Sequence, residues 1–212
     1  MKAFAWLAFA LLIPAAFADQ WNSPESRAFP SPNGHFILRV VPGHIHISGE
    51  IPGLERFNLP PDTQPTRSTM AQIFELTAKG DRYQKIREFS LLNQSSPVDA
   101  CISDLGEVYT FDDWGSMGRG LVVVCYSADG KLKKEFTLED LIPAKPRAEI
   151  EENHRSVSST WWRKDSGRIQ TTVPHFGMGY IVVITDILGG NVVIIPSDTI
   201  TAKYYPAEKE SK

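Results

Sequence analysis

Short apolar runs alternate with polar turns along most of the chain. Three segments share one pattern, in which a polar turn with glycine leads into β-branched and aromatic residues: 29–40, 100–111 and 162–173. Their turn glycines are Gly34, Gly106 and Gly167. A tight hairpin needs positive φ at such a position, and the residues that follow suit a pleated surface. Each segment is therefore predicted to form a β-hairpin.

A second hairpin is predicted after each of the first three, at residues 73–86, 121–136 and 180–195. The repeated unit is then a four-stranded antiparallel meander in three copies, at about 29–95, 96–145 and 156–200. Four-stranded units that recur at this spacing are typical of propeller blades. Closed propellers have about 4–8 blades, so the pattern predicts an all-β, open or incomplete propeller. A β-sandwich built from the same hairpins is the alternative.

The first residues of the chain have the layout of a secretory signal. Lys2 precedes an apolar run over residues 3–14, and Ala16 and Ala18 are the small residues that signal peptidase prefers. We expect cleavage near Ala18 and export to the periplasm or to the medium. Residues 19–205 are then expected to form a single β domain, followed by a polar tail at 206–212.

Composition narrows the choice of partners. The chain of 212 residues has a formal net charge of −3 and no basic run, which argues against nucleic acid as a partner. No later apolar segment approaches the roughly 20 residues of a membrane span. No cofactor motif is present, so no cofactor is predicted.

Two cysteines, Cys101 and Cys125, lie inside apolar strand runs. An oxidising compartment favours a disulfide. The predicted strand order, however, places them two strands apart, at about 9.5 Å, which is too far for a bond. We therefore expect free thiols.

Two loops carry the candidate binding residues. Residues 112–118 and 174–179 each combine an aromatic residue with glycines and a methionine, and both are predicted to join the second and third strands of their copies. An aromatic ring beside glycine can stack on a sugar, a peptide or a partner side chain. The alternative is that the rings cover the core. The candidates are Asp112, Asp113, Trp114, Met117, His175, Phe176 and Met178.

Acidic pairs and metal ligands give weaker signals. Asp112 and Asp113 are adjacent, so on a strand they point to opposite faces, which is unsuited to a paired-carboxylate mechanism. The simpler role for one of them is to accept hydrogen bonds from loop amides. His44 and His46 lie on one face of an extended segment but lack a third ligand at recognisable spacing, so no metal site is predicted.

The middle copy contains several short motifs: Ser-Pro-Val-Asp at 96–99, Thr-Phe-Asp-Asp-Trp-Gly-Ser-Met-Gly at 110–118, and Tyr-Ser-Ala-Asp-Gly-Lys at 126–131. In these it resembles a group of uncharacterised exported bacterial proteins with propeller-like repeats. Residues 158–162, Ser-Ser-Thr-Trp-Trp, belong to the same resemblance, which covers about 70–195. It implies the fold and the compartment only.

Three functions remain open at this point. The leading hypothesis is an exported binding scaffold that presents Trp114 and Phe176 to a protein or envelope component, without turnover. The second is a hydrolase or lyase acting on glycans or peptides of the envelope, with Asp112, Asp113 and His175 as its acids and bases. The third is a structural module that associates with itself into an oligomer.

Overall fold

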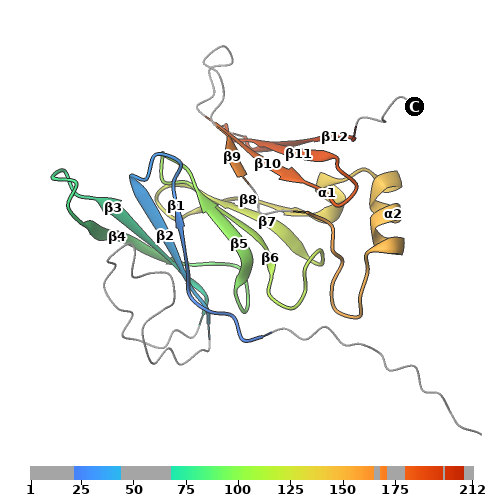
Figure 1. Ribbon diagram of the computed structural model, residues 1–212, viewed down its shortest axis with the longest axis horizontal. Helices are drawn as coiled ribbons and strands as arrows, with labels where there is room; N and C mark the ends of the chain where they lie inside the picture. Colours follow the sequence, from blue (N-terminus) through green and yellow to red (C-terminus); the bar gives the residue numbers. More distant parts are fainter. Residues whose placement is uncertain (1–21, 44–67, 165–167, 171–179, 198, 208–212) are drawn as a thin grey trace, which may run out of the picture.

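The structure is a computed structural model that describes residues 22–43, 68–164, 168–170 (backbone only), 180–197 and 199–207. These residues form three antiparallel sheets of four strands each, and the sheets follow one another in chain order (Figure 1). Two short helices join the second sheet to the third. The prediction of a mostly β fold made of four-stranded antiparallel units is therefore confirmed.

The first sheet is a simple meander. Its strands are β1 (Arg27–Pro30), β2 (Phe36–Val41), β3 (Met70–Leu76) and β4 (Tyr83–Ser90). The turns β1–β2 and β3–β4 contain Gly34 at φ 71° and Gly80 at φ 69°. Positive φ is the conformation that glycine adopts without a steric cost, which explains why the predicted hairpins form here.

The second sheet repeats this meander. Its strands are β5 (Pro97–Ile102), β6 (Val108–Asp113), β7 (Leu121–Tyr126) and β8 (Leu132–Thr137). Strand β7 is almost entirely buried, whereas the first four residues of β8 are exposed. Lysines on this outer strand discourage pairing with another sheet.

Two helices follow β8, namely α1 (Leu138–Leu141) and α2 (Ala144–Asn153). Thr137 and Asp140 form a capping box, in which each side chain accepts a hydrogen bond from the other residue's backbone N–H. Such a cap satisfies N–H groups that the first helical turn leaves open. The buried side chains of Leu138 and Leu141 attach α1 to the core beside the second sheet.

The third sheet contains β9 (Arg168–Gln170), β10 (Ile181–Thr185), β11 (Asn191–Ile195) and β12 (Thr201–Tyr205). Here the predicted hairpin around Gly167 is wrong. Before Gly167, Arg163 forms an isolated antiparallel β-bridge with Asp186, directly after β10. After Gly167, β9 pairs antiparallel with Ile181–Val183 of β10. The chain on both sides of Gly167 therefore runs along the same neighbouring segment. Strand β12, which the pattern did not predict, completes the sheet.

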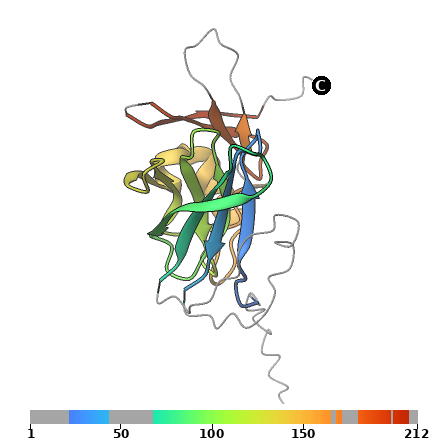
Figure 2. The same cartoon turned by 90° about the vertical axis from the view of Figure 1, so that its left-hand side faces the viewer.

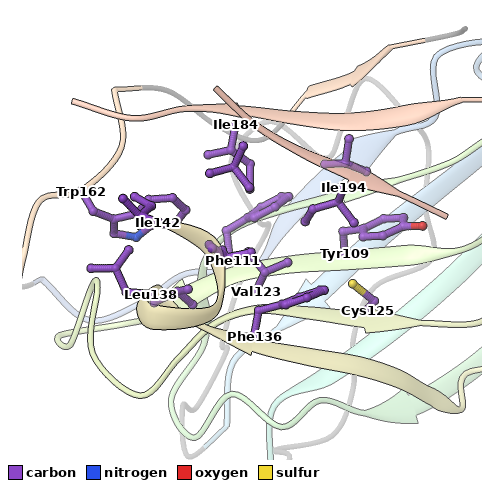
Figure 3. Close-up of a cluster of buried hydrophobic side chains, with 14 of the residues drawn as sticks. Tyr109, Phe111, Val123, Cys125, Phe136, Leu138, Ile142, Trp162, Ile184 and Ile194 are labelled. Atoms are coloured by element: carbon purple, nitrogen blue, oxygen red, sulfur yellow. The ribbon is translucent and has the colours of Figure 1, made fainter. Parts of the chain in front are cut away.

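Two hydrophobic clusters lie between the sheets. One fills the space between the first and second sheets, with Leu38, Ile73 and Val124 among its members. The other lies between the second and third sheets, where Ile184 and Ile194 point toward Phe111 and other second-sheet residues (Figure 3). The second sheet is thus covered on both faces, which accounts for the nearly continuous burial of β7.

The first strands of the three sheets lie next to one another. Strand β1 contacts β5, and β5 contacts β9, while β4, β8 and β12 occupy the outer edges. Figure 2 shows the first sheet toward the viewer and the third sheet across the top. Inner first strands and outer fourth strands are also what consecutive blades of an open propeller would have. Among the described residues, no helix is long and apolar enough to cross a bilayer.

The stack has two ends, which we name by their loops. The hairpin end carries the turns β1–β2 and β5–β6, where Asp104 accepts a hydrogen bond from the Asn33 amide. The junction end carries the β6–β7 loop, residues 159–163 and the β10–β11 turn. At the junction end the Thr160 amide donates to the Met117 carbonyl at 2.7 Å. The candidate site lies at the junction end.

Candidate functional site

Asp112 organises the junction end. It lies near the end of β6 with φ 55°, a left-handed conformation that few residues other than glycine adopt, and it is only 1% exposed. Its Oδ1 accepts from the Gly118 amide and from the Trp162 indole N–H, both at 2.8 Å. Its Oδ2 accepts from Arg163 Nε at 2.8 Å. The side chain thereby links the second sheet to the start of the third.

The backbone of Asp112 extends this link to the first sheet. Its carbonyl accepts from Asn93 Nδ2 at 2.7 Å, and Asn93 belongs to the β4–β5 connection. Burial raises the pKa of the Asp112 carboxyl, while the Arg163 guanidinium and the donors from Trp162 and Gly118 act in the opposite direction. Since both oxygens accept protein donors, the Asp112 carboxylate serves the junction between sheets.

A cavity of about 330 Å³ opens beside Asp112, where the first strands meet. We call it the first-strand pocket. It is lined by Arg27, Val98, Asp99, Met117, Trp161, Arg163 and Lys164. Strand β1, strand β5 and the segment before β9 all contribute to it, so its shape depends on the packing of all three sheets.

The carboxylate of Asp99 is the most unusual group in the first-strand pocket. The residue is 5% exposed, and its Oδ2 is buried without a hydrogen bond. Its nearest cations are Arg27 Nη2, 3.7 Å from Oδ1, and Arg163 Nη1, 3.9 Å from Oδ2. These distances are longer than hydrogen bonds, so Oδ2 keeps unused capacity to accept one. A buried acceptor in this state is costly unless a partner satisfies it.

The rest of the first-strand pocket combines positive charge with an aromatic ring. Arg27 is half-exposed and donates to the Val98 carbonyl at 2.6 Å, so its guanidinium is held at the pocket. Lys164 adds a third cation to those of Arg27 and Arg163. Trp161 is 44% exposed, which is uncommon for so large an apolar side chain. The pocket thus offers cations, one acceptor and one stacking surface.

A second cavity of about 300 Å³ lies on the other side of Asp112, toward the first sheet. We call it the β6–β7 pocket. It is lined by Leu92, Asn93, Gln94, Asp113, Ser116, Arg119, Gly120, Leu121 and Val124. Asp113 therefore faces away from the first-strand pocket. As expected, the two adjacent aspartates face opposite sides, and one of them, Asp112, accepts a hydrogen bond from a loop amide, that of Gly118.

The other predicted residues are partly separated by the fold. Trp114 is half-buried and donates from Nε1 to the Asn22 carbonyl at 2.7 Å, while Met117 is buried and lines the first-strand pocket. The remaining candidates lie outside the described residues: His44, His46, His175, Phe176 and Met178.

Of the two loops that the sequence related to each other, residues 112–118 are described by the structure, and residues 174–179 lie outside the described residues. The loop that contains Trp114 joins β6 to β7 at the junction end, whereas residues 171–179 join β9 to β10. Tyr180, directly after that segment, donates to Glu107 at the hairpin end. The expectation that both loops connect second to third strands is therefore wrong for the third sheet, because β9 is its first strand.

Within the described residues, no group of three or more histidine, cysteine or acidic side chains could hold a metal ion. Cys101 and Cys125 are free thiols, and Tyr109 of the intervening strand pairs with both.

Sequence reasoning missed the residues that define the first-strand pocket. Asp99 is a single carboxylate in the apolar strand Pro-Val-Asp-Ala-Cys-Ile, and Arg163 follows two tryptophans. A charged residue inside an otherwise apolar run is the signal that could have identified them, since buried charges need partners. Their partnership depends on three sheets meeting at one point, which local pattern does not encode.

No protein-family model matches this chain, and no curated protein sequence matches it. Among solved structures, the periplasmic gluconolactonase PpgL of Pseudomonas aeruginosa is similar with a TM-score of 0.41 and 16% sequence identity. The similarity covers 88% of this chain and 46% of that chain, so this chain spans less than half the length of the enzyme. A likeness at this level carries neither a fold assignment nor an activity. The resemblance to uncharacterised exported proteins stays a prediction.

Proposed function

We propose that the protein is an exported binding module that holds a small, hydroxyl-bearing anionic ligand, such as an acidic sugar unit of the envelope, in the first-strand pocket. The observation that carries this proposal is the Asp99 carboxylate, which is buried in the pocket with one oxygen lacking a hydrogen bond. A ligand hydroxyl is the donor that would complete its hydrogen bonding.

The cations of the pocket define the charge of the ligand. The buried carboxylates of Asp99 and Asp112 are offset by Arg163 and Arg27, and Lys164 leaves one net positive charge. Guanidinium and ammonium groups bind carboxylates and phosphates through charge-assisted hydrogen bonds. One anionic group on the ligand therefore fits the charge of the pocket.

Trp161 supports a sugar as the body of the ligand. Its half-exposed ring offers an apolar surface on which the face of a pyranose can stack, while the polar groups nearby accept and donate hydrogen bonds. The cavity of about 330 Å³ is near the lower end of ligand pockets. This volume suits a short fragment or a chain end.

Binding without turnover fits the carboxylates of this region. Glycoside hydrolysis commonly needs two carboxyl groups that flank one bond. Asp99 is the one carboxyl group among the described residues that line the first-strand pocket. Asp112 is committed to Gly118, Trp162 and Arg163, and Asp113 faces the β6–β7 pocket. Export remains part of the proposal and rests on the leader pattern of residues 1–18.

The test is calorimetric binding of short uronic-acid oligosaccharides, with neutral glucose oligosaccharides for comparison. We expect the acidic ligands to bind and the neutral ones to bind at least about tenfold more weakly, because a charge-assisted hydrogen bond is worth about 1.5–3 kcal/mol. Arg27→Gln and Trp161→Ala should each weaken binding by a similar factor. Tyr205→Ala, which removes an aromatic residue of similar exposure on β12, should leave it unchanged.

Circular dichroism must first show that each variant is folded. Failure of every acidic sugar to bind, or equal affinity in wild type and both pocket variants, would reject the first-strand pocket as the site. Release of a shortened sugar product by the wild type, lost in Asp113→Ala, would instead support an enzyme.

A further inference from the structure

The β6–β7 pocket has one apolar wall and one polar wall. Leu92, Leu121 and Val124 form the apolar wall, and Leu92 is 47% exposed. The polar wall comes from Asn93, Asp113, Ser116 and Arg119. The pocket lies between the first and second sheets and shares no lining residue with the first-strand pocket. Anything it binds is therefore recognised independently of the proposed sugar ligand.

Asn93 presents a buried acceptor at this pocket. It is 6% exposed, and its Nδ2 donates to the Asp112 carbonyl at 2.7 Å. A carbonyl oxygen can only accept, so this bond fixes which end of the amide is nitrogen and which is oxygen. The Oδ1 atom is left buried without a hydrogen-bond partner. Native structures rarely leave such an atom unsatisfied, so this oxygen is suited to accept a hydrogen bond from a ligand donor.

Opposite charges line the same pocket. Asp113 is half-buried, and its Oδ1 accepts from the Ser95 amide at 3.3 Å. Arg119 donates from Nη2 to the Ser156 carbonyl at 3.3 Å, which uses one of the five N–H donors of a guanidinium. Within the described part of the chain, Asp113 and Arg119 form no ion pair with each other. The pocket therefore holds a separated negative and positive charge.

From this arrangement we propose that the β6–β7 pocket binds a free α-amino acid with an apolar side chain. The ammonium group of the ligand donates to Asp113 and to Oδ1 of Asn93, and its carboxylate accepts from Arg119. Its side chain packs on Leu92 and Leu121. An ammonium group has three donors and no acceptor, which matches a carboxylate beside an orphaned carbonyl oxygen.

The size and charge of the pocket favour this ligand over larger or singly charged molecules. A volume of about 300 Å³ accommodates one amino acid and leaves little room for a folded partner's surface. A ligand with only an ammonium group would leave Arg119 unmatched, and one with only a carboxylate would leave Asp113 and Asn93 unmatched. The zwitterion satisfies all three groups.

The experiment is isothermal titration of the full-length mature protein with L-leucine, glycine, N-acetyl-L-leucine and L-leucine amide. We expect leucine to bind with a dissociation constant of about 1 mM or tighter. N-acetyl-leucine, which lacks the ammonium, and leucine amide, which lacks the carboxylate, should each bind at least about tenfold more weakly. Glycine should also bind more weakly, because it does not reach the apolar wall.

Asp113→Asn is the informative variant, because its amide oxygen can still accept from the Ser95 amide while the charge is lost. We expect it to weaken leucine binding by about tenfold or more. Lys164→Gln, in the first-strand pocket, is the control that should leave leucine binding unchanged and weaken only the acidic sugar. The proposal is overturned if leucine does not bind at about 10 mM, if N-acetyl-leucine binds as well as leucine, or if Asp113→Asn binds leucine with wild-type affinity.

Discussion

The two interfaces of the second sheet differ in how they use buried polar groups. Its interface with the third sheet has a polar cluster at each end. At the junction end Asp112 binds Trp162 and Arg163, and at the hairpin end Tyr180 donates to Glu107 and lies 2.8 Å from the Tyr109 hydroxyl. Between them lies the apolar cluster that Figure 3 shows.

The interface between the first and second sheets is held differently. Its buried part is mostly apolar, and its polar groups include the Tyr126 hydroxyl, which accepts from the Leu92 amide at 2.8 Å, and the Asn93 amide, which donates to the Asp112 carbonyl at 2.7 Å. Further hydrogen bonds across it, such as the one from the Asn33 amide to Asp104, lie at exposed positions. Exposed polar contacts contribute little net stability, whereas apolar burial is strong but non-directional.

The two interfaces therefore differ in how precisely they fix the position of a sheet, as well as in how they attach it. Apolar burial attaches both outer sheets, but directional bonds to Asp112 fix where the third sheet begins. A group with three buried donors tolerates little displacement, because any shift leaves a buried charge unpaired. The first-strand pocket is built on this fixed interface. The β6–β7 pocket lies in the apolar one, where the Asn93 oxygen stays unsatisfied.

Removal of the Asp112 carboxylate is the strongest test of the difference between the two interfaces. Asp112→Ala removes the closer of the two carboxylates that flank the buried Arg163 guanidinium, so we expect a loss of about 3–5 kcal/mol in the free energy of unfolding. Urea denaturation followed by tryptophan fluorescence measures it. Asp104→Ala, which removes an exposed acceptor at the other interface, should cost no more than about 1 kcal/mol. Equal losses of stability in the two variants would show that the two interfaces do not differ in their dependence on polar bonds.

A pair of glycines in one loop tests how closely the β6–β7 loop approaches the third sheet. Gly118 and Gly115 both have positive φ, at 71° and 83°. A Cβ at Gly118 would collide with the Thr160 carbonyl oxygen, whereas a Cβ at Gly115 would enter open space. We expect Gly118→Ala to destabilise by about 2–4 kcal/mol, from strain plus overpacking. Thermal unfolding of both variants checks this.

Gly115→Ala serves as the internal reference, because it carries the same kind of backbone strain without the collision. It should lose only about 1–2 kcal/mol. If the two alanine variants unfold at the same temperature, the close approach of Thr160 to the loop does not contribute to stability.

Tyr126→Phe addresses one hydrogen bond within the other interface. It keeps the ring in the apolar cluster but leaves the Leu92 N–H without its acceptor, so a loss of about 1–2 kcal/mol is expected. Urea denaturation again gives the value. A loss as large as that of Asp112→Ala would show that this interface also depends on a polar bond.

The sequence predicted the first two sheets well because their turns are local. Gly34, Gly80 and Gly130 occupy turns that require positive φ, and β-branched runs follow them. The third sheet could not be predicted in the same way. Residues 165–167 have turn-like composition, yet the chain before and after them pairs with β10, a partner chosen by tertiary contact. A local sequence pattern does not show which strand a segment will pair with.

The candidate site was predicted only in part, for the same reason. The sequence singled out Asp112, Asp113 and Met117 from one loop, and all three border the two pockets or the junction between them. It missed Asp99, whose unsatisfied oxygen becomes apparent only when β5 is packed between its neighbours. An orphaned acceptor is a property of the assembled sheets and is not encoded in any one segment.

Cys125 is a local probe of the interface between the second and third sheets. Burial raises the pKa of this thiol from its ordinary value of 9.0 to about 12, so the folded protein keeps it protonated between those values while the unfolded chain loses the proton. Its contribution to stability is therefore complete below about pH 9 and is lost as the pH rises toward 12. Since only the thiolate reacts, thiol labelling at about pH 8 should require opening of the interface.

The labelling rate of Cys125 then compares how the two interfaces open. In a Cys101→Ser background, Asp112→Ala should accelerate labelling of Cys125, because it releases the third sheet that covers this thiol. Tyr126→Phe should accelerate it less at matched temperature, because it loosens the first sheet on the opposite face. Local opening free energies are read from such rates. If both substitutions accelerated labelling only in proportion to their loss of global stability, the sheets would open as one cooperative unit, and the contrast between the interfaces would describe their bonding but not their independent motion.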